Sequence, residues 1–145
     1  MLHPCFFDKS GELYVTGRSK DLIIIRGRNH APEDIEYSVQ NACKFLRPGC
    51  IAAIAAPMHR KASKISKSDD LNGDTLCVIA EVRDGVDKGT AQKDIDNLVQ
   101  TIPQRHGITC DFVAIVPKGS LPKTTSGKLR RGKAREMLGN GAFKM

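Results

Sequence analysis

The pattern of apolar and polar residues along the chain predicts a small sheet. Apolar runs lie at residues 50–56, 75–82 and 110–116, and a shorter run rich in isoleucine lies at residues 21–25. Glycine, proline or polar clusters bound these runs, as is typical of β-strands. We therefore expect about three main strands, preceded by a short strand at residues 21–25.

Apolar residues recur at helical spacing in two segments between these strands. The first helix is expected to begin at Pro32, with acidic residues in its first turn, and to end near Cys43. The second is expected over residues 88–106, with Pro103 kinking or ending it and Gly107 as its stop. The predicted buried face of this second helix consists of Ala91, Ile95, Leu98, Val99 and Ile102.

The N-terminal residues predict a separate unit. Residues 5–7 and 11–16 flank a turn-forming cluster and should form a β-hairpin. Polar residues 17–20 separate this hairpin from the first strand. We expect the boundary here, between a hairpin unit of residues 1–19 and a domain of residues 20–145.

Two loops and one more helix complete the predicted architecture. Residues 58–73 are rich in lysine and serine and predict a mobile surface loop. A second loop is expected over residues 117–127 and a short basic helix over residues 129–138. The order of elements predicts an α+β fold: a small sheet of about three main strands flanked by helices, with an N-terminal β-hairpin.

Composition favours a cytoplasmic protein with reduced thiols. The longest apolar stretch, residues 51–57, is too short to cross a bilayer, and the N-terminus lacks the pattern of a signal peptide. The five cysteines are widely spaced, without a Cys-x-x-Cys pair or a histidine at metal-ligand spacing. We expect mostly buried, free cysteines and no metal site.

The excess of positive charge is confined to one segment. The net charge is +7, from 23 Lys and Arg against 16 Asp and Glu. Seven of the basic residues lie within residues 117–135, which contain no acidic residue, so the rest of the chain is balanced. A local cation cluster of this kind indicates an encounter with an anion such as a phosphate.

Two segments at opposite ends of the predicted domain carry chemistry. Residues 16–36 read TGRSKDLIIIRGRNHAPEDIE, and residues 121–131 read LPKTTSGKLRR. They resemble the hinge motif and the catalytic-lysine loop of adenylate-forming enzymes, a superfamily of acyl-CoA synthetases, luciferases, peptide-synthetase adenylation domains and fatty-acid-AMP ligases. The resemblance covers essentially the whole chain. It implies the fold of the C-terminal lid domain and makes residues 1–19 a remnant of the N-terminal adenylation domain.

Lys128 matches the lysine that, in this superfamily, enters the site during adenylation. A carboxylate attacking the α-phosphorus of ATP brings two anions together, so an ammonium that bridges them stabilises the transition state. Ser126 and Gly127 give the loop conformational freedom. The resemblance therefore implies that Lys128 is the catalytic residue of this chain.

The hinge motif supplies the other implied site residues. Arg18 matches a nucleotide-binding arginine, and Lys20 matches the hinge residue whose torsions change when the lid rotates. Gly27, with Arg26 and Arg28, belongs to the loop on the acceptor side, where a missing side chain lets a thin substrate arm pass. No metal ligand is implied.

The resemblance implies the mobile C-terminal domain of a fatty-acid-AMP ligase. Such an enzyme activates a fatty acid with ATP and Mg²⁺, releases pyrophosphate, and passes the acyl group to the phosphopantetheine thiol of a carrier protein. The implied partners are the fatty acid, the acyl carrier protein or CoA, and the N-terminal domain that binds most of the ATP. The chain alone is not expected to be active or to hold a cofactor. The sequence around residues 26–30 favours this class over long-chain acyl-CoA ligases, which are the alternative.

Two departures from the family pattern stand out. Ala31 lies where an aromatic residue is usual, and the Thr-Gly-Asp signature is replaced by Met-Leu-His-Pro-Cys. A second alternative is a non-catalytic basic module that docks on nucleic acid or an acidic protein. The basic segment, however, contains no aromatic residue on which bases could stack. We therefore expect no nucleic-acid partner.

Overall fold

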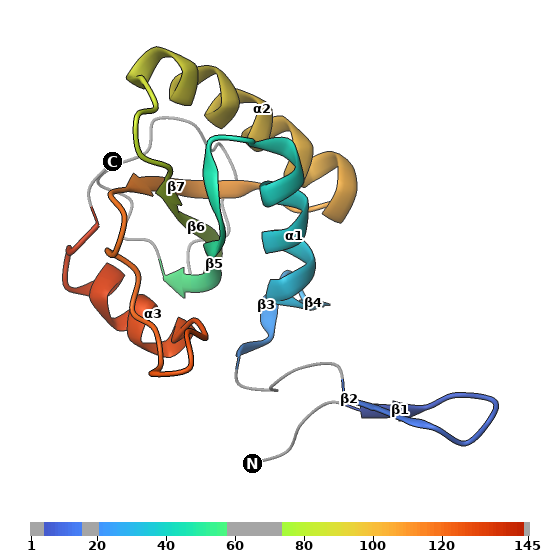
Figure 1. The fold of residues 1–145 in the computed structure, drawn as a ribbon. Coiled ribbons are helices and arrows are strands. Elements are labelled where there is room, and N and C mark those ends of the chain that lie inside the picture. The colour runs from blue at the N-terminus through green and yellow to red at the C-terminus, as the bar shows by residue number, and fades with distance from the viewer. Residues whose placement is uncertain (1–4, 16–20, 58–73, 144–145) are drawn as a thin grey trace.

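The computed structural model describes residues 5–15, 21–57 and 74–143. Its N-terminal hairpin pairs β1 (Cys5–Phe7) with β2 (Leu13–Val15) in antiparallel register. The Asp8 carboxylate closes the turn by accepting the backbone N–H groups of Ser10 and Glu12, each at 2.9 Å. Figure 1 shows this hairpin apart from the layered body of the chain. The predicted hairpin is thus confirmed.

A second hairpin follows, and the sequence predicted only half of it. Strand β3 (Ile23–Ile25) pairs with β4 (Arg28–His30), so that Ile25 lies opposite Arg28. The two connecting residues, Arg26 and Gly27, have φ angles of 52° and 74°. Two consecutive positive φ angles are typical of the type I′ turn, whose twist matches that of a hairpin. Strand β4 was not expected because its residues, Arg-Asn-His, are polar.

The central sheet contains β5 (Leu46–Pro57), β6 (Asp74–Val82) and β7 (Cys110–Val116) in the order β5-β6-β7. Strand β6 pairs antiparallel with β5 and parallel with β7. Strand β5 begins four residues before its predicted start, because Gly49, with φ of 72°, lies in a bulge within the strand. The prediction of three main strands is confirmed.

Helices cover both faces of this sheet (Figure 1). Helices α1 (Pro32–Ala42) and α2 (Lys88–His106) lie on one face, and α3 (Arg131–Gly139) lies on the other. Successive strand residues alternate between the two cores, so the strands read as continuous apolar runs. On β5, for example, Ala53 faces α1 and α2, whereas Ile54 faces α3.

The helices confirm the predicted range 88–106 of α2 and its stop at Gly107, and they correct the burial of Val99 and the start of α3. Pro103 lies inside α2, which continues to His106 because the Gly107 N–H closes the last turn on the Pro103 carbonyl at 3.0 Å. Gly107 then stops the helix with φ of 68°. Val99 is 43% exposed, since Leu98 and Ile102 hold the centre of the buried stripe. Helix α3 starts two residues later than predicted.

Within the described ranges, Cys43, Cys50, Cys77 and Cys110 are free thiols, and the first three are buried. Burial raises the pKa of Cys77 to about 11, so this thiol stays protonated at neutral pH. None of the helices described here has the length and apolar character needed to cross a bilayer. The predicted surface loop at residues 58–73 lies outside the described residues.

Candidate functional site

The loop that carries Lys128 is a short hairpin between β7 and α3. A bridge pairs Lys123 with Leu129, and the Thr124 N–H donates to the Lys128 carbonyl at 2.8 Å. The Lys128 N–H donates in turn to the Thr124 hydroxyl at 3.1 Å. Gly127 turns the chain with φ of 85°, a conformation that favours glycine. The loop is therefore held by its own hydrogen bonds.

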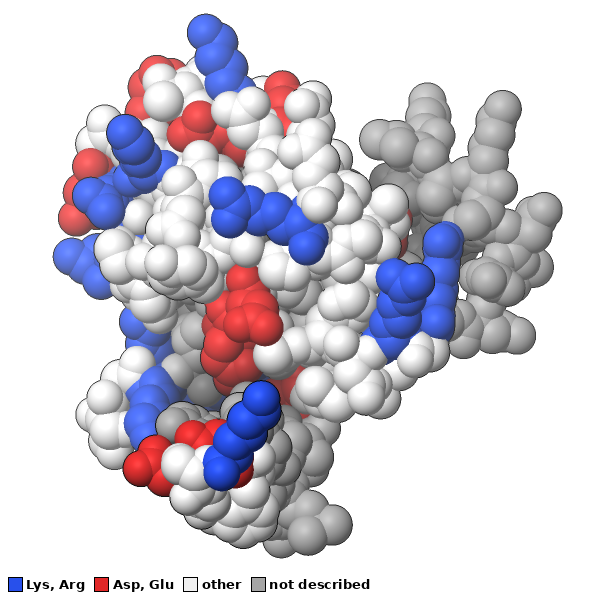
Figure 2. All heavy atoms as spheres, turned by 90° about the vertical axis from the view of Figure 1, so that its right-hand side faces the viewer, with Lys and Arg blue, Asp and Glu red and all other residues white. Residues whose placement is uncertain are grey.

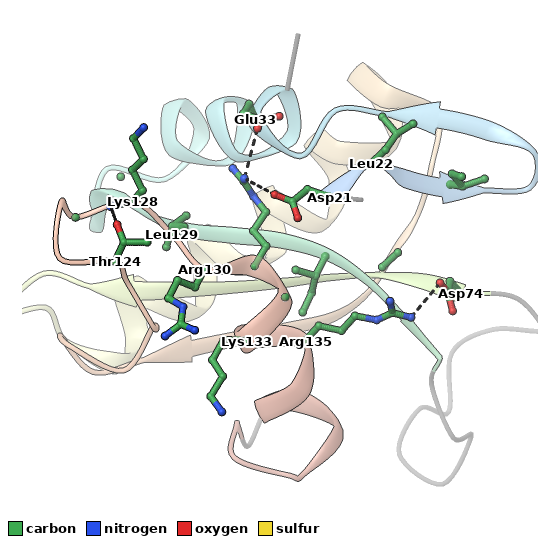
Figure 3. A pocket seen from close by; sticks show the side chains of 17 residues that line it. Asp21, Leu22, Glu33, Asp74, Thr124, Lys128, Leu129, Arg130, Lys133 and Arg135 are labelled. Carbon is green, nitrogen blue, oxygen red and sulfur yellow. Dashed lines mark hydrogen bonds and ion pairs between the residues drawn. The ribbon is translucent and has the colours of Figure 1, made fainter. Parts of the chain in front are cut away.

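Lys128 is exposed and directly follows the turn at the tip of this loop. No residue in the described part of the chain forms an ion pair with its ammonium, and Figure 3 shows the side chain extending away from the loop. Lys133, on α3, points in the opposite direction (Figure 3). The ammonium of Lys128 is thus free to meet an anion from outside the domain.

A buried carboxylate anchors the start of the loop. Glu81 lies at the end of β6 and is only 1% exposed. Its carboxylate accepts the Leu121 N–H at 3.0 Å and forms an ion pair with Arg47. Burial alone would raise the pKa of Glu81, but the backbone N–H groups of Leu121 and Gly119 and the Arg47 guanidinium hold it below its ordinary value. Glu81 is therefore charged at neutral pH.

An arginine anchors the other end of the loop. Arg131, the first residue of α3, is 14% exposed and binds Glu36 of α1 through two parallel hydrogen bonds of 2.8 and 2.7 Å. The same guanidinium lies 3.5 Å from Asp21 and 3.4 Å from Glu33, as the dashed lines in Figure 3 show. The hydrogen bond to Glu36 raises the pKa of Arg131, which stays charged at all relevant pH values.

Glu36 also reaches the edge strand of the sheet. Its Oε1 accepts the Ala53 N–H of β5 at 3.0 Å, a donor that faces away from the neighbouring strand β6. Burial raises the pKa of Glu36, whereas Arg131 and the Ala53 N–H act in the opposite direction. The end of the loop, α1, the segment ahead of β3 and β5 therefore meet at one largely buried group of charges.

An open cavity of about 800 Å³ lies beside the Lys128 loop. Polar and charged side chains from the loop, α3, α1 and the segment ahead of β3 line it, together with apolar groups of β3 and β5. Its charged lining residues are Lys128, Arg130, Arg131, Lys133, Arg135, Asp21, Glu33 and Asp74. Arg135 pairs with Asp74 at 3.5 Å across the cavity (Figure 3). Such a lining suits a polar, anionic ligand better than an apolar one.

The predicted acceptor-side residues lie elsewhere. Arg26, Gly27 and Arg28 form the turn and the start of β4, and none of them lines the cavity. Arg26 lowers the pKa of Asp111, which burial raises, so this turn lies near the start of β7. A Cβ on Gly27 would meet nothing within 4 Å, so the positive φ of the turn is what requires glycine in this chain.

The predicted nucleotide arginine, Arg18, and the predicted hinge, Lys20, lie outside the described residues. Asp21, which directly follows Lys20, does line the cavity and contacts Arg131. The described chain immediately after the predicted hinge is therefore bonded to the base of the Lys128 loop.

Sequence reasoning missed Glu36, Glu81 and Arg131 as anchors of the site. Glu81 carried one usable signal, because it is a charged residue within LCVIAEV, the otherwise apolar part of β6. The partners Glu36 and Arg131 lie 95 positions apart, and no local pattern connects them. In the sequence Arg131 is one of seven basic residues in the segment 117–135, whereas in the structure its charge is bound by Asp21, Glu33 and Glu36.

Both signs of charge appear on the face of the molecule drawn in Figure 2. Asp and Glu gather in a central patch on this face, and Lys and Arg lie around it. A nucleic-acid-binding surface needs a continuous basic stripe or patch. Among the described residues, the face drawn in Figure 2 carries no such stripe.

A family model described as "Disco-interacting protein 2-like, AMP domain" matches residues 20–145. The chain is 37% identical to the long-chain-fatty-acid–AMP ligase FadD32 of Mycolicibacterium smegmatis, over 98% of this chain and 24% of that protein. It is 35% identical to the medium-chain-fatty-acid–[acyl-carrier-protein] ligase JamA of Moorena producens, over 89% of this chain and 20% of that protein. The chain thus spans about a quarter or less of the curated relatives it matches.

Solved structures show the same fold. A fatty acyl-adenylate ligase structure, from work on the E. coli and L. pneumophila enzymes, superposes with a TM-score of 0.74 at 29% identity, covering 95% of this chain and 22% of that one. The McyG A-PCP structure complexed with phenylalanyl-adenylate superposes with a TM-score of 0.76 at 22% identity, covering 95% and 20%. The fold is that of a domain of adenylate-forming enzymes.

Proposed function

Because the chain belongs to the disco-interacting protein 2-like AMP domain family of adenylate-forming enzymes, we propose that it is the mobile C-terminal domain of a fatty-acid-AMP ligase. In this function Lys128 supplies the ammonium for adenylation. The observation that carries the proposal is the exposed Lys128, which has no ion-pair partner among the described residues and directly follows the turn of a loop anchored at both ends, beside a cavity lined by further cations.

The proposed chemistry has two steps. First, the fatty-acid carboxylate attacks the α-phosphorus of ATP, the bond to the β-phosphate oxygen breaks, and pyrophosphate leaves. Lys128 bridges the carboxylate and phosphate oxygens, where negative charge concentrates in the transition state. Second, a thiol that has lost its proton to the solvent attacks the acyl carbonyl, the bond between the acyl carbon and the AMP phosphate oxygen breaks, and AMP leaves as the thioester forms. ATP carries its Mg²⁺ and is bound mainly by the N-terminal adenylation domain.

The domain division follows from the same proposal. Residues 1–19 belong to the N-terminal domain and residues 20–145 form the lid. The start of the family match at residue 20 supports this division. Lys20 then acts as the hinge, and Arg18 binds the nucleotide. Four described cysteines that are free thiols suit a reducing compartment, so we place the reaction in the cytoplasm.

The proposed acceptor is the phosphopantetheine of an acyl carrier protein. The relatives JamA and TtuA are described as [acyl-carrier-protein] ligases, which supports this choice, and the Arg26, Gly27 and Arg28 turn would face the acceptor. The relative FadD21 of Mycobacterium tuberculosis is described as a putative fatty-acid–CoA ligase, so transfer to CoA is the alternative. Offering both thiols to one preparation of acyl-adenylate decides between them.

The test joins the full 145-residue chain to the N-terminal part of FadD32 that the chain does not match. Pyrophosphate release that depends on fatty acid is then measured. We expect Lys128→Ala to slow this release by about 100 to 1000-fold, the usual effect of losing one transition-state charge contact. The control is Lys118→Ala, which removes an exposed lysine of the same connection.

Lys118→Ala should leave the rate of pyrophosphate release at the wild-type value. A folded fusion that releases pyrophosphate no faster than FadD32 lacking its own matching segment contradicts the proposed function. So does a Lys128→Ala fusion that is as active as the wild-type fusion.

A further inference from the structure

Arg131 differs from every other cation that lines the cavity. Its side chain is 14% exposed and bound by three carboxylates, whereas Lys128, Arg130, Lys133 and Arg135 are exposed. A guanidinium in this setting is not available to an incoming phosphate. Arg131 can therefore act only through the residues that it binds.

We propose that Arg131 is a positioning residue for Lys128. It joins the lysine loop to the chain segment directly after Lys20, so that the loop and this segment move as one body. The inference rests on the function proposed above, in which Lys128 acts in adenylation and Lys20 is the hinge.

The contacts of the loop support this role. The Arg130 N–H donates to the Pro122 carbonyl at 3.0 Å and closes the base of the loop, next to Arg131. Arg131 then reaches Asp21 on one side and Glu36 on the other. A rotation at residue 20 would carry Asp21 with it, and the guanidinium would pass that displacement to the base of the loop.

The local charges support the same role. Asp21, Glu33 and Glu36 place three carboxylates around one guanidinium. Without Arg131, Asp21 and Glu33 would line the cavity without this partner, and they would attract the Lys128 ammonium, which has no ion-pair partner among the described residues, away from a phosphate. A lysine at position 131 would restore the charge but not the two parallel hydrogen bonds to Glu36.

A double-mutant cycle in the FadD32 fusion tests the inference through pyrophosphate release. We expect Arg131→Gln to lower the maximal rate by about 100-fold, as a misplaced catalytic group does, with little change in the KM for ATP. In a Lys128→Ala background, the same substitution should lower the rate by less than about threefold, because the residue acts through Lys128. Arg131→Lys should fall between the wild type and Arg131→Gln.

The control is Arg105→Gln, which removes an exposed arginine at the end of α2 and should leave the rate unchanged. Thermal unfolding of each 145-residue variant reports folding. If Arg131→Gln does not fold, Glu36→Gln takes its place with the same expectation, since it weakens the bidentate pair and keeps the guanidinium.

Independent, multiplicative effects of the Arg131 and Lys128 substitutions would overturn the positioning role. An Arg131→Gln fusion as fast as the wild type would overturn it as well. In both cases a slow Lys128→Ala single variant leaves the proposed function intact. An active fusion in which Lys128→Ala has no effect contradicts the proposed function itself, so the two failures are distinguishable.

Discussion

Glu81 shows how a single buried charge can hold a functional loop. Its carboxylate satisfies backbone N–H groups at the start of the Lys128 loop and pairs with Arg47. A buried carboxylate left without these donors would be costly, and donors left without the carboxylate would be costly too. The residue is therefore structural, and it acts on the loop that carries the proposed chemistry.

Replacing Glu81 with glutamine should lower the free energy of unfolding at neutral pH by about 2 kcal/mol, because charge-assisted hydrogen bonds are weakened. Urea unfolding measures this change. Asp74→Asn is the control, because Asp74 forms an exposed pair with Arg135. Its loss should change the free energy of unfolding by less than about 1 kcal/mol.

The same residue predicts a pH dependence of stability. The folded-state pKa of Glu81 lies below the ordinary value of 4.5, so its contribution is present above that value. The contribution is lost as the pH falls below 4.5 and through the lower folded-state pKa. Below this range the stability difference between wild type and Glu81→Gln should therefore shrink. A difference that stays constant on acidification would show that Glu81 is not charged in the fold.

The β3-β4 hairpin illustrates how backbone geometry selects residues. Gly27 has φ of 74° and open space around it. A larger residue at this position is therefore disfavoured by the backbone conformation and not by a steric clash. Gly132, in α3, also has open space around it but no positive φ angle. These two glycines form a matched pair, because both have open space around them and only Gly27 has a positive φ angle.

Gly27→Ala should destabilise the chain by about 1 kcal/mol, because alanine is strained at positive φ. Gly132→Ala should stabilise it by up to about 1 kcal/mol, because alanine favours the helix and restricts the unfolded chain. Thermal unfolding of both variants measures the two effects. Equal shifts in the same direction would contradict the turn conformation described for Gly27.

The elements that sequence analysis predicted correctly are those whose residues carry their own signal. Strand β7 was placed without error because its apolar run is bounded on both sides, and α1 begins at the predicted Pro32. Strand β4 was not predicted, because its pairing with β3 is set by the turn and not by apolar residues. The ion pairs of Arg131 depend on tertiary structure alone, and for that reason they could not be predicted.

The fold brings the segment after Lys20 and the Lys128 loop together. The chain just after Lys20 and the loop near the C-terminus, far apart in sequence, meet beside the same cavity (Figure 3). Helices on both faces of the sheet make the body between them a single packed unit. In a lid that rotates as one piece, a lysine at its rim can enter a neighbouring site in one pose and leave it in another.

Separate measurement of the two half-reactions in the FadD32 fusion tests whether Lys128 acts in one pose only. One assay follows acyl-adenylate formation from fatty acid and ATP, and the other follows transfer from preformed acyl-adenylate to the phosphopantetheine thiol. Lys128→Ala should slow the first step by about 100-fold or more and leave the second within about twofold of the wild-type rate. Equal slowing of both steps, or of neither, would contradict a lysine that enters the site for adenylation and then withdraws.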